Sequence, residues 1–233
     1  MNILNSLPLN FSEVLKKLGD HPIRVIDASK CIPLDLSETN GELGAIDVSS
    51  ALKLGDYVNG VISKHHGEVA YGGYLEIRTI YKRSRHFNKQ AEEERNIHLG
   101  VDLWCEAETP IYAPLDGTVH SSKNNTNYGD YGPTIILKHD FDGVEFYTLY
   151  GHLSLDSIKH LKVGKIFRQN EEIATLGDAS VNGDYPPHLH FQIIKDLQGC
   201  QGDYPGVCNE KALEFYKTNC PNPEFLLNLE RAY

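Results

Sequence analysis

Residues His188 to Ile193 alternate strictly between polar and apolar side chains, and a period of two is compatible with a β-strand but not with a helix. The two faces of this strand carry His188, His190, Gln192 and Ile194 on one side, and Leu189, Phe191 and Ile193 on the other. The apolar face predicts contact with a core, and the polar face predicts a site that receives two imidazoles.

From Ile97 onward the chain is a series of short apolar runs separated by turn signals, and we expect these runs to be strands. The expected strands are Pro110–Ala113, Gly117–Ser121, Thr134–His139, Val144–Tyr150, Glu172–Leu176 and His188–Ile194. Asp142 and Gly143 give the strongest hairpin signal, and residues 121–132 read as a long polar loop that forms a cleft wall. The predicted fold class is mainly β, with an antiparallel sheet, an α+β N-terminal extension and short C-terminal helices.

The N-terminal residues, up to about residue 90, show a different pattern from the rest. A helix is expected from Ser12 to Leu18, and a further turn or two of helix from Ser49 to Lys53, ending at Gly55. Residues 73–81 alternate like a strand and place Tyr74, Glu76 and Arg78 on one face. Helical patterns return at residues 210–216 and 225–229.

Histidines and one carboxylate gather in three short segments. His98 and Asp102 lie four residues apart with Gly100 between them, and Gly100 with β-branched Val101 favours a strand over a helix. On a strand Gly100 would leave space between the two side chains. His152 adds a fourth imidazole after an apolar run. Two histidines and a carboxylate, with room for water, are the ligand set of a catalytic zinc site, and two further histidines could transfer protons during hydrolysis.

These segments carry a family resemblance over roughly residues 95 to 195. The motifs are His98-x-Gly-x-Asp102, the following Pro110-Ile-Tyr-Ala-Pro-Leu-Asp-Gly117, Tyr150-Gly-His152-Leu and His188-Leu-His190-Phe. In order and spacing they resemble the lysostaphin/LytM-type zinc metallopeptidases, which cleave peptide bonds in bacterial peptidoglycan. The resemblance implies one Zn²⁺ per chain, held by His98, Asp102 and His190, with His152 and His188 as catalytic histidines.

The resemblance also implies a division of the chain. Residues 91–200 are expected to form the zinc metallopeptidase core, 1–90 an extension that packs on or covers the cleft, and 201–233 a C-terminal extension. In related proteins an N-terminal segment can supply an asparagine ligand, for which Asn59 and Asn88 are candidates by position.

The expected function is metallo-endopeptidase hydrolysis of amide bonds in peptidoglycan peptides or fragments. His188, beside a ligand, is expected to be the base, and His152 to stabilise the oxyanion or protonate the leaving amine. Tyr74, Glu76, Arg78 and Tyr150 are the expected substrate-binding residues. Two alternatives stay open: a catalytically inactive regulator or binding module that shares the fold, and a non-haem iron enzyme with the same two-histidine, one-carboxylate set.

Composition limits the possible partners and compartments. A formal net charge of −10 argues against nucleic acid, and no apolar run approaches the ~20 residues that span a bilayer. The N-terminus lacks the pattern of a signal peptide, so we expect a cytoplasmic protein as written, or a periplasmic or extracellular one if a leader was removed. Cys200, Cys208 and Cys220 allow one disulfide, although the missing export signal favours reduced thiols. Nothing in the sequence indicates an oligomeric state.

Overall fold

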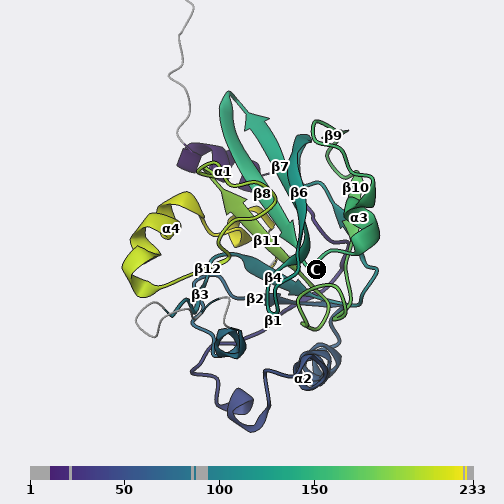
Figure 1. The fold of residues 1–233 in the computed structure, drawn as a ribbon, viewed down its shortest axis with the longest axis vertical. Helices are drawn as coiled ribbons and strands as arrows, with labels where there is room; N and C mark the ends of the chain where they lie inside the picture. Colours follow the sequence, from purple (N-terminus) through teal and green to yellow (C-terminus); the bar gives the residue numbers. More distant parts are fainter. Residues whose placement is uncertain (1–10, 21–22, 85–86, 88–93, 228, 230–233) are drawn as a thin grey trace, which may run out of the picture.

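The computed structural model describes residues 11–20, 23–84, 87, 94–227 and 229, and it is built on one eight-stranded sheet (Figure 1). In spatial order the strands are β1 (Cys31–Pro33), β2 (Val69–Gly72), β4 (Val101–Trp104), β11 (His188–Ile194), β8 (Val144–Gly151), β7 (Gly132–Phe141), β6 (Gly117–Asn125) and β9 (Ile166–Phe167). Only β1 and β2 pair in parallel, and every other neighbouring pair in this sheet is antiparallel. The predicted mainly β class with a large antiparallel sheet is confirmed.

Two small sheets and several short helices complete the fold. β5 (Pro110–Tyr112) pairs with β10 (Glu172–Thr175), and β3 (Ile97–His98) pairs with β12 (Val207–Cys208). The α-helices are α1 (Phe11–Gly19), α2 (Ala51–Lys64), α3 (Leu155–Lys159), α4 (Leu213–Asn219) and α5 (Glu224–Leu227). The 3₁₀ helices are η1 (Gly41–Ala45), η2 (Ile80–Arg83) and η4 (Glu210–Ala212). In the part of the chain that the structure describes, no helix has the length and apolarity needed to cross a bilayer.

The two faces of the main sheet differ as the alternation in β11 predicts. Leu189, Phe191 and Ile193 are fully buried in the largest apolar cluster, to which α1 contributes Val14 and Leu18. On the other face, smaller apolar clusters flank the polar side chains of β11. The sheet therefore separates a continuous core from a polar site.

Most predicted elements are present, with different lengths. The first helix forms as α1, and the Asp142–Gly143 turn joins β7 and β8 with positive φ at both residues. The helix expected to end at Gly55 continues to Lys64, because Leu54 and Val58 bury one face of it and Ser50 caps its first turn. The polar loop expected at 121–132 is shorter, since β6 runs to Asn125 and β7 begins at Gly132.

The strand predicted for residues 73–81 is wrong. Gly73 and Leu75 have φ of 107° and 59°, which interrupts an extended backbone, and η2 begins at Ile80. The segment is instead a turn that passes beside β3, where the Leu75 amide donates to the His98 carbonyl at 2.8 Å. His98 and Asp102 likewise lie on two short strands, β3 and β4, and not on one.

The N-terminal residues up to 90 contribute directly to the main sheet. β1 and β2 extend it beyond β4, with Ala70 opposite Trp104 and Gly72 opposite Asp102. The division of the chain into three parts stays a prediction. Cys200, Cys208 and Cys220 are free thiols.

Candidate metal centre

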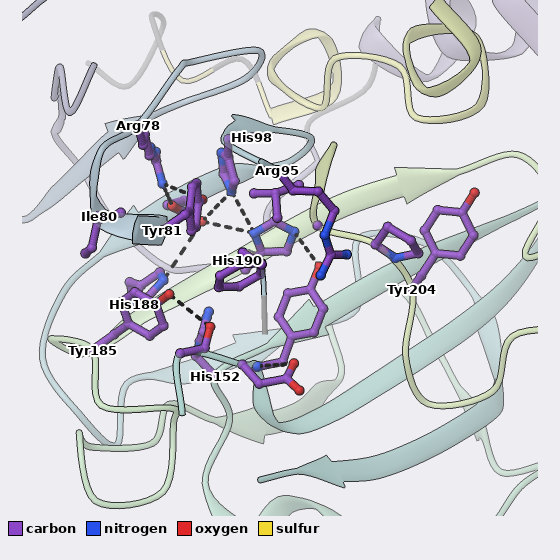
Figure 2. A pocket seen from close by; sticks show the side chains of 18 of the residues that line it. Arg78, Ile80, Tyr81, Arg95, His98, His152, Tyr185, His188, His190 and Tyr204 are labelled. Carbon is purple, nitrogen blue, oxygen red and sulfur yellow. Dashed lines mark hydrogen bonds and ion pairs between the residues drawn. The ribbon is translucent and has the colours of Figure 1, made fainter. Parts of the chain in front are cut away.

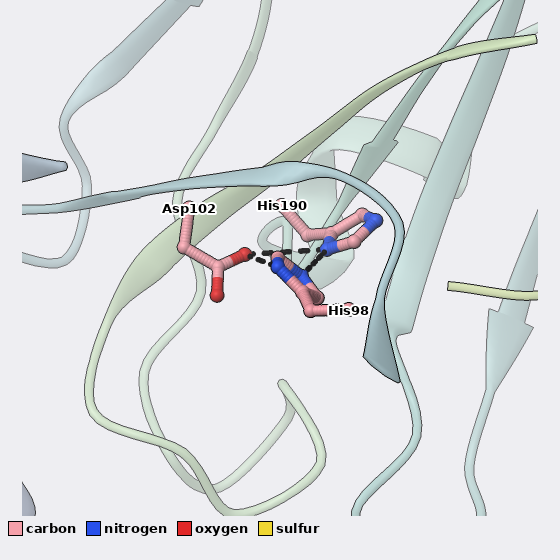
Figure 3. Close-up of side chains that lie close together, drawn as sticks. All are labelled: His98, Asp102 and His190. Atoms are coloured by element: carbon pink, nitrogen blue, oxygen red, sulfur yellow. Dashed lines mark hydrogen bonds and ion pairs between the residues drawn. The ribbon is translucent and has the colours of Figure 1, made fainter. Parts of the chain in front are cut away.

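His98, Asp102 and His190 converge from three strands on one point (Figure 3). The register of the sheet places His190 of β11 opposite Asp102 of β4, and His98 lies at the end of β3. The Oδ1 atom of Asp102 is 3.3 Å from Nε2 of His98 and 3.2 Å from Nδ1 of His190, and these two nitrogens are 2.9 Å apart. All three side chains are at most 3% exposed.

Hydrogen bonds fix which ring nitrogen of each histidine faces the others. His98 donates Nδ1–H to the Gly73 carbonyl at 2.8 Å, and His190 donates Nε2–H to Oε1 of Gln192 at 3.0 Å. A neutral imidazole has a single N–H, so Nε2 of His98 and Nδ1 of His190 are left as acceptors. Two lone pairs and a carboxylate oxygen thus point at one another, and a cation between them removes their repulsion. The donor set therefore fits a divalent metal ion.

His152 and His188 lie beside this cluster with their rings 4.1 Å apart (Figure 2). His152 donates Nδ1–H to the Asn182 carbonyl at 2.7 Å, and His188 donates Nδ1–H to the Pro186 carbonyl at 2.8 Å. The Nε2 atom of each ring is therefore an acceptor, and that of His188 lies 4.0 Å from Oδ1 of Asp102.

Burial keeps three of the site histidines neutral. It lowers the pKa of His98 and of His188 to about 4, and it lowers the pKa of His152 well below the ordinary value. Burial opposes ionisation of Asp102, but the charge of Arg78, which donates to its Oδ2 atom, holds the pKa of that carboxyl well below its usual range. At neutral pH the site thus holds one carboxylate, and the imidazoles of His98, His152 and His188 are neutral.

The four residues expected to bind substrate lie in different surroundings. Arg78 lines the cavity but is buried against Asp102, at 2.5 Å from its Oδ2 atom. Glu76 binds Arg78 and does not line the cavity, and the Tyr74 hydroxyl donates to the Cys220 carbonyl at 2.7 Å. Tyr150 is fully buried in the apolar cluster on the opposite face of the sheet. Of the four, Arg78 lines the cavity, and Tyr74, Glu76 and Tyr150 do not.

Two aromatic residues that the sequence did not single out border the histidines. The Trp104 indole stacks on His188 with ring centres 3.9 Å apart and an angle of 18°. Its position two residues after Asp102, on the same face of a strand, was a usable signal. The Tyr131 hydroxyl lies 3.4 Å from Nε2 of His190. Tyr131 stands at the end of a loop, where the sequence has no periodicity from which its position could be predicted.

The histidines open into a cavity of about 300 Å³ (Figure 2). One wall comes from residues 78–81 of the N-terminal segment, and another comes from residues 200–207 after β11. Gly129, Asp130 and Tyr131 line it from the loop before β7, as expected of a cleft wall. Asn59 is exposed on α2 and does not line this cavity, and Asn88 lies outside the described residues.

Comparisons with known proteins concern mainly the central region. Residues 96–202 match the model of peptidase family M23. An uncharacterized metalloprotease of Haemophilus influenzae is 36% identical over 95 residues, covering 41% of this chain and 18% of that protein. An L-Ala--D-Glu endopeptidase of Bacillus subtilis is 25% identical over 177 residues, covering 70% of this chain and 52% of that protein. The peptidoglycan DD-endopeptidase ShyA of Vibrio cholerae is 31% identical over 98 residues, covering 42% and 20%. The chain spans between about a fifth and a half of the length of these relatives.

Proposed function

We propose that this chain, with its peptidase family M23 domain at residues 96–202, is a zinc-dependent metallo-endopeptidase that hydrolyses amide bonds in peptidoglycan peptides or fragments. The observation that carries the proposal is the set of five buried side chains, in which three potential ligands adjoin two histidines with free acceptor nitrogens. The names of the Bacillus subtilis and Vibrio cholerae relatives support a peptidoglycan substrate. A cavity of about 300 Å³ suits a short peptide segment.

In this proposal Nε2 of His98, Nδ1 of His190 and Oδ1 of Asp102 would hold one zinc ion. A zinc ion in such a site polarises the scissile carbonyl and lowers the pKa of water toward ~7. His188 is neutral and fixed by the Pro186 carbonyl, so its Nε2 can accept the proton of the attacking water. His152, held by the Asn182 carbonyl and in ring contact with His188, can then take up this proton on its Nε2 atom and, once protonated, hydrogen-bond the developing oxyanion or pass the proton to the leaving amine. Each histidine is expected to contribute roughly 10²–10⁴ in rate.

The test begins with the metal. Elemental analysis of the purified protein should give about one zinc per chain, and alanine at His98, Asp102 or His190 should abolish tight binding. Alanine at His152 or His188 should keep the zinc and lose most hydrolysis, because these side chains move protons and do not hold the ion.

Digestion of purified peptidoglycan and of soluble muropeptides, with mass spectrometry of the products, identifies the bond. Iron in place of zinc in the native protein would favour the non-haem iron enzyme. Zinc without hydrolysis of peptidoglycan, muropeptides or peptides would favour the inactive binding module.

A further inference from the structure

Arg78 is a buried cation beside the candidate metal centre, and it lies outside the residues that match the peptidase family. Its side chain is 4% exposed and bridges two carboxylates, with Nη1 at 2.5 Å from Oδ2 of Asp102 and Nε at 2.5 Å from Oε2 of Glu76. A planar guanidinium can serve two carboxylates in fixed directions, which a lysine cannot do.

The two oxygens of Asp102 consequently have separate tasks. Oδ2 accepts from Arg78, while Oδ1 faces Nε2 of His98 and Nδ1 of His190. Because Oδ2 is occupied, the carboxylate cannot rotate freely, and it presents one oxygen to the point where the ligands converge. Arg78 thus leaves Oδ1 available to a metal ion and does not occupy its place.

Glu76 holds the arginine from the far side. Its Oε1 atom accepts the Leu36 amide at 2.9 Å, and its Oε2 atom accepts from Arg78. The pair of Glu76 and Arg78 is neutral as a whole, which reduces the cost of a buried cation next to a metal ion. The chain of contacts runs from the Leu36 backbone through Glu76 and Arg78 to Asp102.

The same turn also orients His98. The Gly73 carbonyl accepts Nδ1–H of His98, so residues 73–78 touch two of the three potential ligands. Gly73 has φ of 107°, and a Cβ atom there would meet Nη2 of Arg78 at 1.9 Å and Nδ1 of His98 at 2.9 Å. Only glycine allows the turn to approach both side chains so closely.

We propose that Arg78, held by Glu76, is a positioning residue that fixes Asp102 as a ligand through one oxygen, and that residues 73–78 form part of the metal centre. This inference rests on the proposed function, since it assumes that the centre binds a metal ion. By this inference the N-terminal segment forms part of the site, whereas a segment that only covered the cleft could be removed without loss of the metal centre.

The test compares zinc affinity of Arg78→Gln, Arg78→Lys, Glu76→Gln and wild type by competition with a chromogenic chelator. Loss of a side chain that orients a ligand typically weakens binding 10- to 100-fold, and we expect this for both Arg78 variants. Glu76→Gln acts one step further away, and we expect roughly 3- to 10-fold. The visible spectrum of the cobalt(II)-loaded Arg78 variants should also shift, because ligand geometry changes.

Arg83→Gln is a matched control, because the Arg83 side chain is also 4% exposed and contacts the Asp184 carbonyl at 2.8 Å, away from the ligands. It should lower stability without changing zinc affinity. If Arg78→Gln does not fold, the zinc affinity of the isosteric variant Glu76→Gln decides whether the inference holds. Unchanged affinity and spectra would overturn the inference, and tighter binding would identify Arg78 as a competitor of the metal. Absence of zinc binding by the wild type would instead defeat the proposed function.

Discussion

Replacement of Gly100 by alanine tests whether the site depends on a missing side chain between its ligands. Gly100 lies between His98 and Asp102 on the face of the chain that looks toward His190. A Cβ atom there would lie 2.6 Å from Cε1 and 2.7 Å from Nε2 of His190, and 2.8 Å from the Phe191 carbonyl oxygen. The added methyl group would therefore press on a potential ligand and on the backbone of β11.

The size of the effect follows from what can move. The His190 ring is held by Gln192 and cannot rotate away without losing that hydrogen bond. The Phe191 carbonyl belongs to the central strand, which must shift by roughly 0.6 Å to reach ordinary van der Waals contact. Overpacking of this kind costs about 1–3 kcal/mol of unfolding free energy. Displacement of a ligand by half an ångström or more should weaken zinc binding about tenfold or more.

Urea unfolding of the metal-free protein and chelator competition measure the two effects separately. The matched control is Gly60→Ala, because Gly60 lies in α2 and its added Cβ would have no neighbour within 4 Å. That variant should be more stable by about 0.4–1 kcal/mol, with unchanged zinc affinity. If Gly100→Ala matched the wild type in both assays, the steric argument would be refuted.

Three further predictions use other parts of the fold. Burial lowers the pKa of His139 to about 4, so the unfolded state takes up its proton first as pH falls from 6.5. Stability is then lost between pH 6.5 and 4, by at most about 3 kcal/mol from this residue, and urea unfolding of His139→Gln should show a correspondingly weaker pH dependence. Tyr150→Phe should lower stability by about 1 kcal/mol or less and leave KM unchanged, and a raised KM would support the predicted role of Tyr150 in substrate binding. A chain beginning at residue 91 lacks β1 and β2 and should not fold by circular dichroism, whereas a folded and more active product would identify the segment as an inhibitory cover.

The elements that were predicted correctly have a pattern that is set locally. The bounds of β11 and the assignment of its faces follow from alternation, and the Asp142–Gly143 turn follows from residues that tolerate positive φ. The convergence of His98, Asp102 and His190 was expected from family resemblance and not from geometry, since three separate strands contribute them.

The elements that were predicted incorrectly depend on contacts between distant residues. Residues 73–78 have the alternation of a strand, yet they form a turn. The turn is stabilised by the ion pair of Arg78 with Asp102 and by the hydrogen bond from His98 to the Gly73 carbonyl. The length of α2 depends on the burial of Leu54 and Val58, which outweighs the low helix propensity of its glycines. No pattern within one segment contains these pairings.

Tyr150 and His152 show how one backbone angle decides which side chain enters the site. They are two residues apart, so a regular strand would direct both to the same face. Tyr150 follows the strand and lies in the core with Phe191, at a ring distance of 5.5 Å. β8 ends at Gly151, and His152 adopts φ of 63°, which turns its imidazole toward His188 on the opposite face. Left-handed backbone is unfavourable for histidine, and it is held here by the His152 amide, which donates to the Tyr131 carbonyl at 2.8 Å. The reversal explains why Tyr150 lies in the core while His152, two residues later, lies beside the candidate metal centre.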